Sequence, residues 1–596
     1  MFFSLKKYRR NIFLIIAFFF TRFTYAQLAM TNIDGRNKQN LDGAWKVIID
    51  PTDVGEWRQV WTEKKPQKKT DFVEYSFDEG PVLQVPGDFN TQMPELAYLE
   101  GVVWYKKTFT YHKKRNRRLF VYFGAVNYRA GVYLNGKYIG SHDGGFTPFQ
   151  FELTDSVAEG NNRLIVKADN QRLKEGLPGL GYDWFNYGGI TREVYLVETG
   201  KTFIEDYHIQ LQKGSLTKVA GWVILNGINK KQKITVSIPE LKINYTTSTD
   251  SAGHADIQFS SDFQLWSPMN PKLYKVWIRS EQDTINDDIG FRSIEVQNDA
   301  VLLNKKAVFL KGVDIHEERP FHSARAFSQH DALTLLTWAK ELGCNFVRLV
   351  HYPHSEHMVK QAEKMGLMVW DEIPVYQNIE FNAPGMQGRL NSMMREMLRR
   401  DRNRCAVIIW SLSNETYTTT PNRTQALIEL AKNCRTEDST RLITGALSNQ
   451  SYVNNTVTVW DTIVNYYDVI AVNEYLGWYV PWQGKPSEVT WKFAVQKPLI
   501  ISEFGGEAKY GSHFGPKEEA NSWSEEYQEQ IYKDQIQMFK TTSNLAGVSP
   551  WLLIDYRSPG RMQPVKQNGY NRKGLLSEYG KRKKAWFVLK QYYNSR

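Results

Sequence analysis

The segment Ala406-Val-Ile-Ile-Trp-Ser-Leu-Ser-Asn414-Glu415 places a glutamate directly behind an apolar run, and Pro498-Leu-Ile-Ile-Ser502-Glu503 repeats the pattern. Continuous runs of β-branched and aliphatic residues are typical of strands buried in a parallel sheet. In a (β/α)₈ barrel, reactive side chains lie where such strands end. The two segments therefore predict a barrel with Glu415 and Glu503 at its mouth.

A pair of glutamates at strand ends suits the hydrolysis of a glycosidic bond. Glu415 and Glu503 are separated by 88 positions, so they belong to different strands and can face one bond as general acid and nucleophile. Asn414 adds an amide for a sugar hydroxyl, and Gly505-Gly506 lets a substrate approach the backbone. Taken singly, each glutamate could equally well be a helix cap or an arginine partner as a catalytic residue. Together they favour a catalytic pair.

The chain after Asn298 alternates apolar segments with amphipathic ones, as a (β/α)₈ barrel does. Eight segments are predicted as strands, at residues 308–313, 346–350, 367–370, 407–412, 441–444, 469–472, 499–501 and 548–552. Helices are predicted between several of them, for instance over 331–342, ending at Gly343, and over 356–364, ending at Gly366. Glu415 then follows the fourth strand and Glu503 the seventh.

Two β-rich regions precede the barrel. Within residues 41–197, short alternating strands such as 118–123 and 130–134 are separated by turn signals at Asn135-Gly136 and Asp143-Gly144-Gly145, which is typical of an antiparallel jelly-roll β-sandwich. Residues 201–297 contain strands near 222–225, 234–238 and 273–278, and this length fits an immunoglobulin-like β-sandwich. The predicted domains are a jelly-roll domain, an immunoglobulin-like domain and a catalytic (β/α)₈ TIM barrel, at residues 27–199, 200–297 and 298–596.

Residues 1–26 have the features of a cleavable signal peptide. Four basic residues between positions 6 and 10 precede the apolar stretch 12–20, and Thr24-Tyr25-Ala26 resembles a signal-peptidase site. Nine apolar residues are too few to span a bilayer, and no later segment has the length and apolarity of a membrane helix. We therefore expect an exported protein, periplasmic or secreted, that begins near Gln27 and has no permanent membrane anchor.

The composition indicates several domains, is compatible with sugar binding and does not indicate a nucleic-acid partner. The 596 residues are too many for one core, and the 14% of aromatic residues would suit stacking against sugar rings, although most rings are expected in the cores. The formal net charge of +11 falls to +6 without the five basic residues of the leader, and so mild an excess does not indicate a nucleic-acid partner. Cys344, Cys405 and Cys434 lie in apolar patterns and are expected to be buried free thiols.

No cofactor is predicted. His351, His354 and His357 are close along the chain, but no His-Glu-x-x-His run accompanies them, so we expect no catalytic metal and assign His351 to substrate contact. The sequence also contains no Gly-rich phosphate loop or nucleotide fingerprint. The expected partner is a carbohydrate substrate, and the oligomeric state stays open, a homo-oligomer included.

With these domains and glutamates in this order, the chain resembles the family 2 glycoside hydrolases over nearly all of its mature length. The markers are Gly290-Phe-Arg-Ser293, Lys311-Gly-Val-Asp-Ile-His-Glu317, Arg348-Leu-Val-His-Tyr-Pro353 and Trp370-Asp-Glu372. The resemblance implies that Glu415 is the acid/base, Glu503 the nucleophile and Asn414 the group holding the sugar 2-hydroxyl. It also places Tyr475 beside the nucleophile, where Tyr475 and Arg348 would keep Glu503 anionic. A retaining mechanism follows, with carboxyl groups about 5 Å apart.

The segment Asn571-Arg-Lys573 is similar to the Asn-x-Lys of the β-glucuronidase branch, which grips the sugar carboxylate. A cation and an amide make charge-assisted bonds that a neutral hexose cannot return. Asp183 matches a sandwich-domain residue that reaches the glucuronidase pocket. Trp551, at the end of the predicted eighth strand, is the expected platform for sugar stacking. The sequence departs from this branch at Glu474, at Leu476 and over residues 557–562.

The leading interpretation is a retaining exo-β-glucuronidase acting on glucuronic-acid-terminated oligo- or polysaccharides. The long insertion that some glucuronidases fold over small aglycones is missing between Asp371 and Arg399, so a more open mouth is expected. A β-galactosidase, β-galacturonidase or β-mannosidase on the same scaffold is the nearest alternative. A non-catalytic carbohydrate-binding protein is the alternative from another class, and the presence of both Glu415 and Glu503 argues against it.

Overall fold

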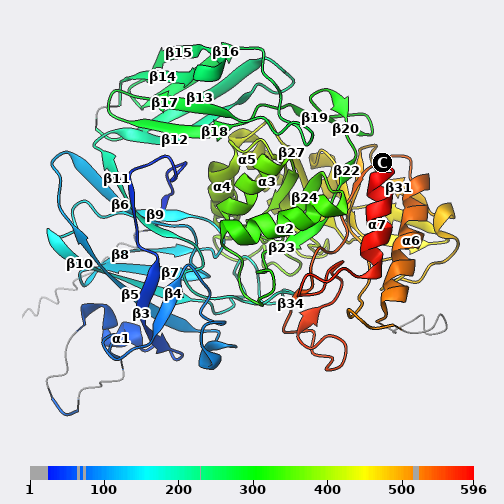
Figure 1. The fold of residues 1–596 in the computed structure, drawn as a ribbon, viewed down its shortest axis with the longest axis horizontal. Coiled ribbons are helices and arrows are strands. Elements are labelled where there is room, and N and C mark those ends of the chain that lie inside the picture. Colours follow the sequence, from blue (N-terminus) through cyan, green and yellow to red (C-terminus); the bar gives the residue numbers. More distant parts are fainter. Residues whose placement is uncertain (1–24, 64–67, 71–74, 229, 514–522) are drawn as a thin grey trace, which may run out of the picture.

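The computed structural model describes residues 25–63, 68–70, 75–228, 230–513 and 523–596. The predicted signal peptide falls almost wholly on residues 1–24, outside the described residues. Two β-sandwiches and a barrel follow one another along the chain, with the barrel at the centre (Figure 1). The predicted fold class is thereby confirmed.

The first sandwich consists of two antiparallel sheets that enclose an aromatic and aliphatic core. One sheet has the order β1 (Gln27–Leu28), β9 (Phe149–Glu152), β6 (Arg117–Phe123), β11 (Val194–Gly200), β2 (Lys38–Asn40). The other has the order β4 (Val82–Val85), β3 (Gly43–Asp50), β5 (Val102–Tyr111), β10 (Gly160–Asp169), β7 (Arg129–Leu134), β8 (Lys137–Asp143). The predicted turn at Asn135-Gly136 joins β7 to β8, and both of its residues have positive φ, 52° and 82°, as a tight hairpin turn requires.

The second sandwich is built from a three-stranded and a four-stranded sheet. Its strands are β12 (Phe203–Leu211), β13 (Lys218–Asn226) and β16 (His254–Ser260) on one side, and β15 (Ile243–Ser248), β14 (Lys233–Ile238), β17 (Tyr274–Arg279) and β18 (Thr284–Ile289) on the other. Alternate residues such as Val219, Val223 and Leu225 point into a common core. A short hairpin sheet of β19 (Ile294–Gln297), β20 (Ala300–Leu303) and β21 (Lys306–Ala307) then leads into the barrel.

The barrel strands pair in parallel in the order β22, β33, β32, β30, β27, β26, β25, β24, β23. They span Leu310–Lys311 (β22), Leu545–Val548 (β33), Leu499–Glu503 (β32), Ile470–Asn473 (β30), Leu442–Leu447 (β27), Val407–Asn414 (β26), Met368–Glu372 (β25), Phe346–Val350 (β24) and Asp314–His316 (β23). Only two residues separate β22 from β23, so these short strands are two parts of the first barrel strand. One part pairs with β33 and the other with β24, which closes the ring.

Two predicted barrel strands were wrong in extent. The segment 308–313 is divided at Gly312, where an added Cβ would lie 2.7 Å from Phe346 and 2.8 Å from the Val548 carbonyl oxygen. The chain therefore changes partners there, and the strand resumes at Asp314. The last strand ends at Val548 instead of residue 552, because Pro550 has no N–H for a ladder. Trp551 accordingly lies three residues beyond the strand end.

Helices cover the outside of the barrel: α2 (Gln329–Leu342), α3 (Glu356–Met365), α4 (Met386–Asp401), α5 (Arg423–Glu437), α6 (Glu525–Thr541) and α7 (Lys584–Asn594). The predicted ends of α2 and α3 are confirmed, since Gly343 and Gly366 adopt positive φ of 100° and 69°. Helix α2 begins two residues earlier than predicted, because Ser328 and Asp331 form a capping box. None of the helices in the described ranges is long and apolar enough to cross a membrane.

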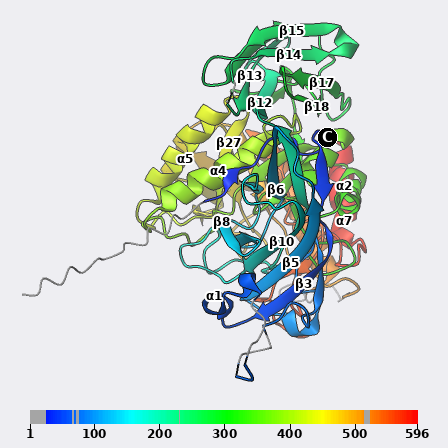
Figure 2. The same ribbon diagram turned by 90° about the vertical axis from the view of Figure 1, so that its left-hand side faces the viewer.

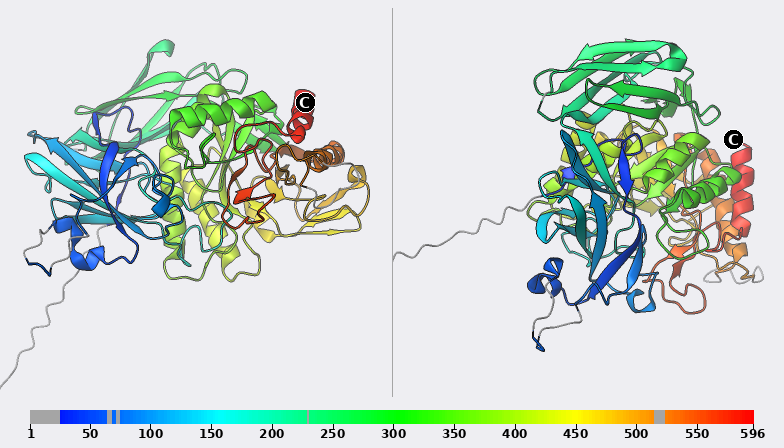
Figure 3. Two further views of the ribbon diagram at one scale, coloured as in Figure 1. Left: turned by 60° about the horizontal axis from the view of Figure 1, so that its bottom comes forward. Right: turned by 60° about the vertical axis from the view of Figure 1, so that its left-hand side comes forward.

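Buried arginines join the domains. Arg292, from the Gly-Phe-Arg-Ser marker, donates to the carbonyl oxygens of Cys405 (3.0 Å) and Val407 (2.6 Å) at the base of the barrel. Arg192 of the first sandwich donates to Phe146 O (2.6 Å) and Pro353 O (2.7 Å) beside the barrel mouth. The immunoglobulin-like domain lies above the other two domains in Figure 2 and in the right panel of Figure 3. The contacts of Arg192 hold the first sandwich against the barrel, and those of Arg292 hold the end of the second sandwich against it.

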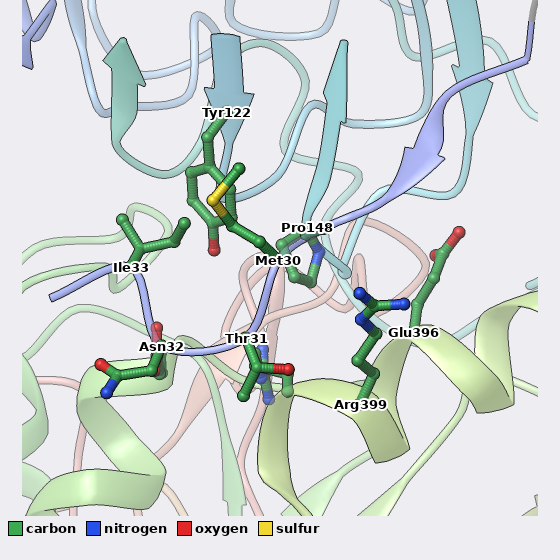
Figure 4. Close-up of a pocket in the computed structure, with 11 residues that line it drawn as sticks. Met30, Thr31, Asn32, Ile33, Tyr122, Pro148, Glu396 and Arg399 are labelled. Atoms are coloured by element: carbon green, nitrogen blue, oxygen red, sulfur yellow. The ribbon is translucent and has the colours of Figure 1, made fainter. Parts of the chain in front are cut away.

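The N-terminal segment runs along the seam between the first sandwich and α4 (Figure 4). Met30 N–H donates to Gln150 in the sandwich, at 3.0 Å. Glu396, on α4, lies 3.1 Å from His142 Nε2 of the sandwich. The small hollow here is lined by seam residues and contains none of the predicted site residues. Cys344, Cys405 and Cys434 are buried free thiols, as predicted.

Candidate active site

The two glutamates at the strand ends face a common centre. Glu503 is the last residue of β32, and Glu415 directly follows β26 with a positive φ of 52°. Asn473, at the end of β30, donates through Nδ2 to Glu415 Oε1 (3.0 Å) and Asn414 Oδ1 (3.1 Å). Asn414 Oδ1 also accepts from Arg348 Nη2 (2.8 Å), and Arg348 Nη1 contacts Glu503 Oε1 (3.0 Å). A continuous set of hydrogen bonds therefore links the two carboxyl groups.

Arg348 is the charged centre beneath the nucleophile. It is fully buried on β24, and its guanidinium contacts the carboxylates of Glu372 (3.2 Å) and Asp314 (3.4 Å) in addition to Glu503. Burial opposes the ionisation of Glu372, yet Arg348 and His351 together lower its pKa to about 2. His351 Nδ1 lies 2.7 Å from Glu372 Oε1, and burial lowers the pKa of the imidazole. The ring is therefore neutral at pH 7 and held in a fixed orientation.

Glu503 accepts from two donors, Arg348 and the hydroxyl of Tyr475 (2.8 Å). Burial raises the pKa of Glu503; Arg348 opposes the rise, the Glu415 carboxylate adds to it, and Tyr475 opposes it again. The pKa of Glu503 therefore lies above that of an ordinary glutamate. The two donors stabilise the anion that attack on a sugar requires.

The raised pKa of Glu503 has a consequence for the pH dependence of catalysis. A nucleophile reacts only when ionised, so kcat/KM should fall as the pH falls through this pKa, which lies above the value of about 4.3 for an exposed glutamate. Tyr475→Phe removes a donor to the anion and should move the acid limb to higher pH. The measurement is kcat/KM against pH for both enzymes, with the exposed Tyr466→Phe as control. An acid limb at the same or lower pH in Tyr475→Phe would contradict the contact.

A second group of charged residues lies beside the nucleophile, and we call Asp183, Glu507, Arg561 and Lys573 the charged cluster. Arg561 joins the Asp183 carboxylate (2.5 Å) to that of Glu507 (3.0 Å). Lys573 Nζ lies 3.3 Å from Glu507 Oε1 and donates to Tyr479 OH at 2.8 Å. Asn571 Nδ2 donates to Asp183 Oδ2 at 3.2 Å. Two cations and two carboxylates alternate in the cluster.

The charged cluster adjoins the glutamates through Tyr475. Lys573 Nζ lies 5.7 Å from the centroid of the Tyr475 ring, and the hydroxyl of that ring donates to Glu503. Lys573 is buried, with 2% of its side chain exposed. An ammonium group that adjoins the nucleophile through one tyrosine ring can bind an acidic group on the same sugar that the nucleophile attacks.

Aromatic rings form a wall beside the glutamates. Trp551 stacks on His351, with ring centroids 4.9 Å apart and planes 17° from parallel. Trp184, from the first sandwich, lies 5.8 Å from His351 and 5.1 Å from Tyr376. Trp551 is 4% exposed. Its part in sugar stacking stays a prediction.

The structure brings all ten predicted site residues into two adjoining groups. The first contains Glu415, Asn414, Glu503, Tyr475, Arg348, His351 and Trp551, and the second contains Asp183, Asn571 and Lys573. The three histidines have separate partners: His351 contacts Glu372, His354 Nε2 lies 3.0 Å from Val350 O, and His357 pairs with Glu193. No group of three or more metal-ligating side chains occurs in the described part of the chain.

Several residues of the site were missed from the sequence. Glu372 ends β25, two residues beyond the predicted strand 367–370, and Asn473 directly follows the predicted strand 469–472. The argument used for Glu415 and Glu503 would therefore have found Asn473. Gln377, Glu507 and Arg561 lie in loops without such a signal. The ammonium group of Lys573 contacts Glu507 and Tyr479, and its binding of a sugar carboxylate stays a prediction.

Models of known protein families match almost the whole chain. Residues 39–200 match "Glycosyl hydrolases family 2, sugar binding domain", residues 202–292 match "Glycosyl hydrolases family 2", and residues 294–595 match "Glycosyl hydrolases family 2, TIM barrel domain". The chain therefore belongs to glycosyl hydrolase family 2, and the resemblance read from its motifs is confirmed.

Within that family, it is similar to proteins named for uronic acids. A putative β-glucuronidase of Formosa agariphila is 27% identical over 554 residues, 84% of this chain and 64% of the length of that protein. The Ruminococcus gnavus β-glucuronidase in complex with D-glucuronic acid is 25% identical, with a TM-score of 0.81, over 96% of this chain and all of that one. A β-galacturonidase of Eisenbergiella tayi is 25% identical, with a TM-score of 0.78, over 96% and 98%.

Proposed function

We propose that this protein is a retaining exo-β-glucuronidase that removes terminal β-linked glucuronic acid from oligo- or polysaccharides. The observation that carries the proposal is the position of Lys573 and Arg561, which lie in the charged cluster next to Tyr475 and Glu503. The C6 carboxylate of a uronic acid bound over Glu503 meets donors there. Similarity to a β-glucuronidase in complex with D-glucuronic acid supports the same substrate class.

The reaction proceeds by double displacement. Glu503 attacks C1 while Glu415 gives a proton to the departing glycosidic oxygen, and a glycosyl ester of Glu503 forms. Water then attacks C1, Glu415 takes its proton, and Glu503 leaves as a carboxylate. Arg348 and Tyr475 hold the Glu503 oxygens during both steps.

The second candidate is a β-galacturonidase. A galacturonide differs from a glucuronide only in the configuration at C4, so the charged cluster serves both sugars, and the Eisenbergiella tayi enzyme is nearly as similar in fold. A β-galactosidase or β-mannosidase has no sugar carboxylate and leaves Lys573 and Arg561 without a partner on the substrate.

A panel of aryl β-glycosides with one leaving group and different sugars tests the proposal. We expect the highest kcat/KM on the glucuronide, and early-time NMR should show the β-anomer of the released sugar. Preference for the galacturonide would favour the second candidate. Preference for a neutral sugar would contradict both, and an α-anomer would replace double displacement by inversion.

We also propose that the protein works outside the cytoplasm. This rests on the leader-like composition of residues 1–26. Export would bring the enzyme to polysaccharide ends, and the short connection between β25 and α4, residues 373–385, would suit such substrates.

A further inference from the structure

Strand β25 pairs with β26, and the connection that follows β25 pairs with the end of β26 again. Asn414 N–H donates to Val375 O at 2.8 Å, and Gln377 N–H donates to Asn414 O at 2.9 Å. Tyr376 forms a parallel bridge with Asn414 between these two bonds. The backbone of residues 375–377 is therefore fixed in register on the residue that precedes Glu415.

The register places the side chain of Gln377 against Glu415. Gln377 Nε2 donates to Glu415 Oε2 at 2.9 Å, while Asn473 Nδ2 donates to Oε1 at 3.0 Å. Each oxygen of the Glu415 carboxylate thus has an amide donor. The two amides hold the carboxylate in one plane.

The two amides differ in their freedom to move. Asn473 is buried, its Oδ1 accepts from Ser502 Oγ at 2.7 Å, and its Nδ2 also contacts Asn414. Gln377 is half-buried, and among the described residues Glu415 is its one side-chain partner. Its neighbour Tyr376 is held between Trp184 (5.1 Å) and His351 (4.9 Å), whereas Asn378 on the other side is exposed. Gln377 is therefore the more exposed of the two amides that contact Glu415.

We infer that Gln377 is a positioning residue for the acid/base and that Glu415 Oε2 is the oxygen that exchanges the proton. A primary amide has a donor and an acceptor end. The NH₂ of Gln377 donates to ionised Glu415, and after a turn of the amide its carbonyl oxygen accepts from protonated Glu415. The Asn473 amide has hydrogen-bond partners at both its NH₂ and its carbonyl oxygen, so it keeps its orientation and Glu415 Oε1 remains the acceptor. The proton then moves from Oε2 to the glycosidic oxygen as the C1–O bond breaks, and returns to Oε2 from water in the second step.

The test is the dependence of kcat/KM on the leaving group in Gln377→Leu, which keeps the size of the side chain and removes its polar end. On aryl β-glucuronides with weakly acidic phenols we expect a loss of roughly ten- to a hundred-fold, part of the ~10²–10⁴ that general acid catalysis supplies. On a dinitrophenyl glucuronide, which needs little protonation, the loss should stay below about threefold. Asn378→Ala, at the exposed neighbouring residue, is the control and should match the wild type on both substrates.

The inference rests on the proposed double displacement but not on the identity of the sugar, and the outcomes separate the two. Equal losses in Gln377→Leu on both leaving groups, or none, would overturn the role of Gln377 while an active wild type leaves the proposed function standing. A wild type inactive on every glycoside of the panel would overturn the proposed function itself. Melting temperatures of all variants show whether a uniform loss comes from unfolding.

Discussion

Glu503→Gln should abolish turnover of every substrate, with kcat lower by on the order of 10⁴ to 10⁶, because no other group replaces the nucleophile that forms the glycosyl ester. Its neighbours Arg348 and Tyr475 would still bind the amide, so the fold and substrate binding should survive. Glu415→Gln should lower kcat/KM by roughly 10² to 10⁴ on poor leaving groups and far less on acidic phenols. Steady-state kinetics on both kinds of aryl glycoside measure these effects.

The exposed Glu488, which pairs only with Lys485 among the ion pairs of the described chain, provides a matched control. Glu488→Gln should leave kinetics and melting temperature unchanged. Near-normal activity of either catalytic variant on all substrates would remove that glutamate from its assigned role. A Glu415→Gln effect independent of the leaving group would remove it as the acid.

Lys573→Ala should depress kcat/KM on an aryl β-glucuronide far more than on the matching β-glucoside or β-galactoside. The substrate carboxylate would lose a charged partner, a penalty of about 2 to 4 kcal/mol, or roughly thirty- to a thousand-fold in kcat/KM. Because Lys573 also contacts Glu507, its removal disturbs the charged cluster, but Arg561 still pairs with that carboxylate. The selectivity of the loss distinguishes substrate binding from a local structural effect.

Kinetics on the sugar panel, with melting temperatures alongside, measure the effect of Lys573→Ala. Lys581→Ala, eight residues further on and exposed, should behave as the wild type. If Lys573 only steadies its loop, all sugars should lose activity alike. That outcome, or a wild type that prefers the galactoside, would contradict the glucuronidase proposal and leave the family assignment intact.

Much of the fold could be predicted because its signals are local. Apolar runs marked the inner barrel strands, and Gly343 and Gly366 marked helix ends through their positive φ. The first barrel strand was misplaced for a reason that is not local, because Gly312 divides it only where the neighbouring strands approach closely. The last strand was misplaced although Pro550, which has no N–H for a ladder, is a local signal for its end.

The sequence by itself determined the order of the domains and the placement of Glu415 and Glu503 at strand ends, because strand burial and strand termination are written in short stretches of residues. Only the tertiary structure decided what surrounds them. Arg561 meets Asp183 across 378 positions, through the docking of the sandwich on the barrel. Gln377 reaches Glu415 through a second backbone pairing with β26. Such contacts depend on how separate elements pack, which no local pattern of residue types specifies.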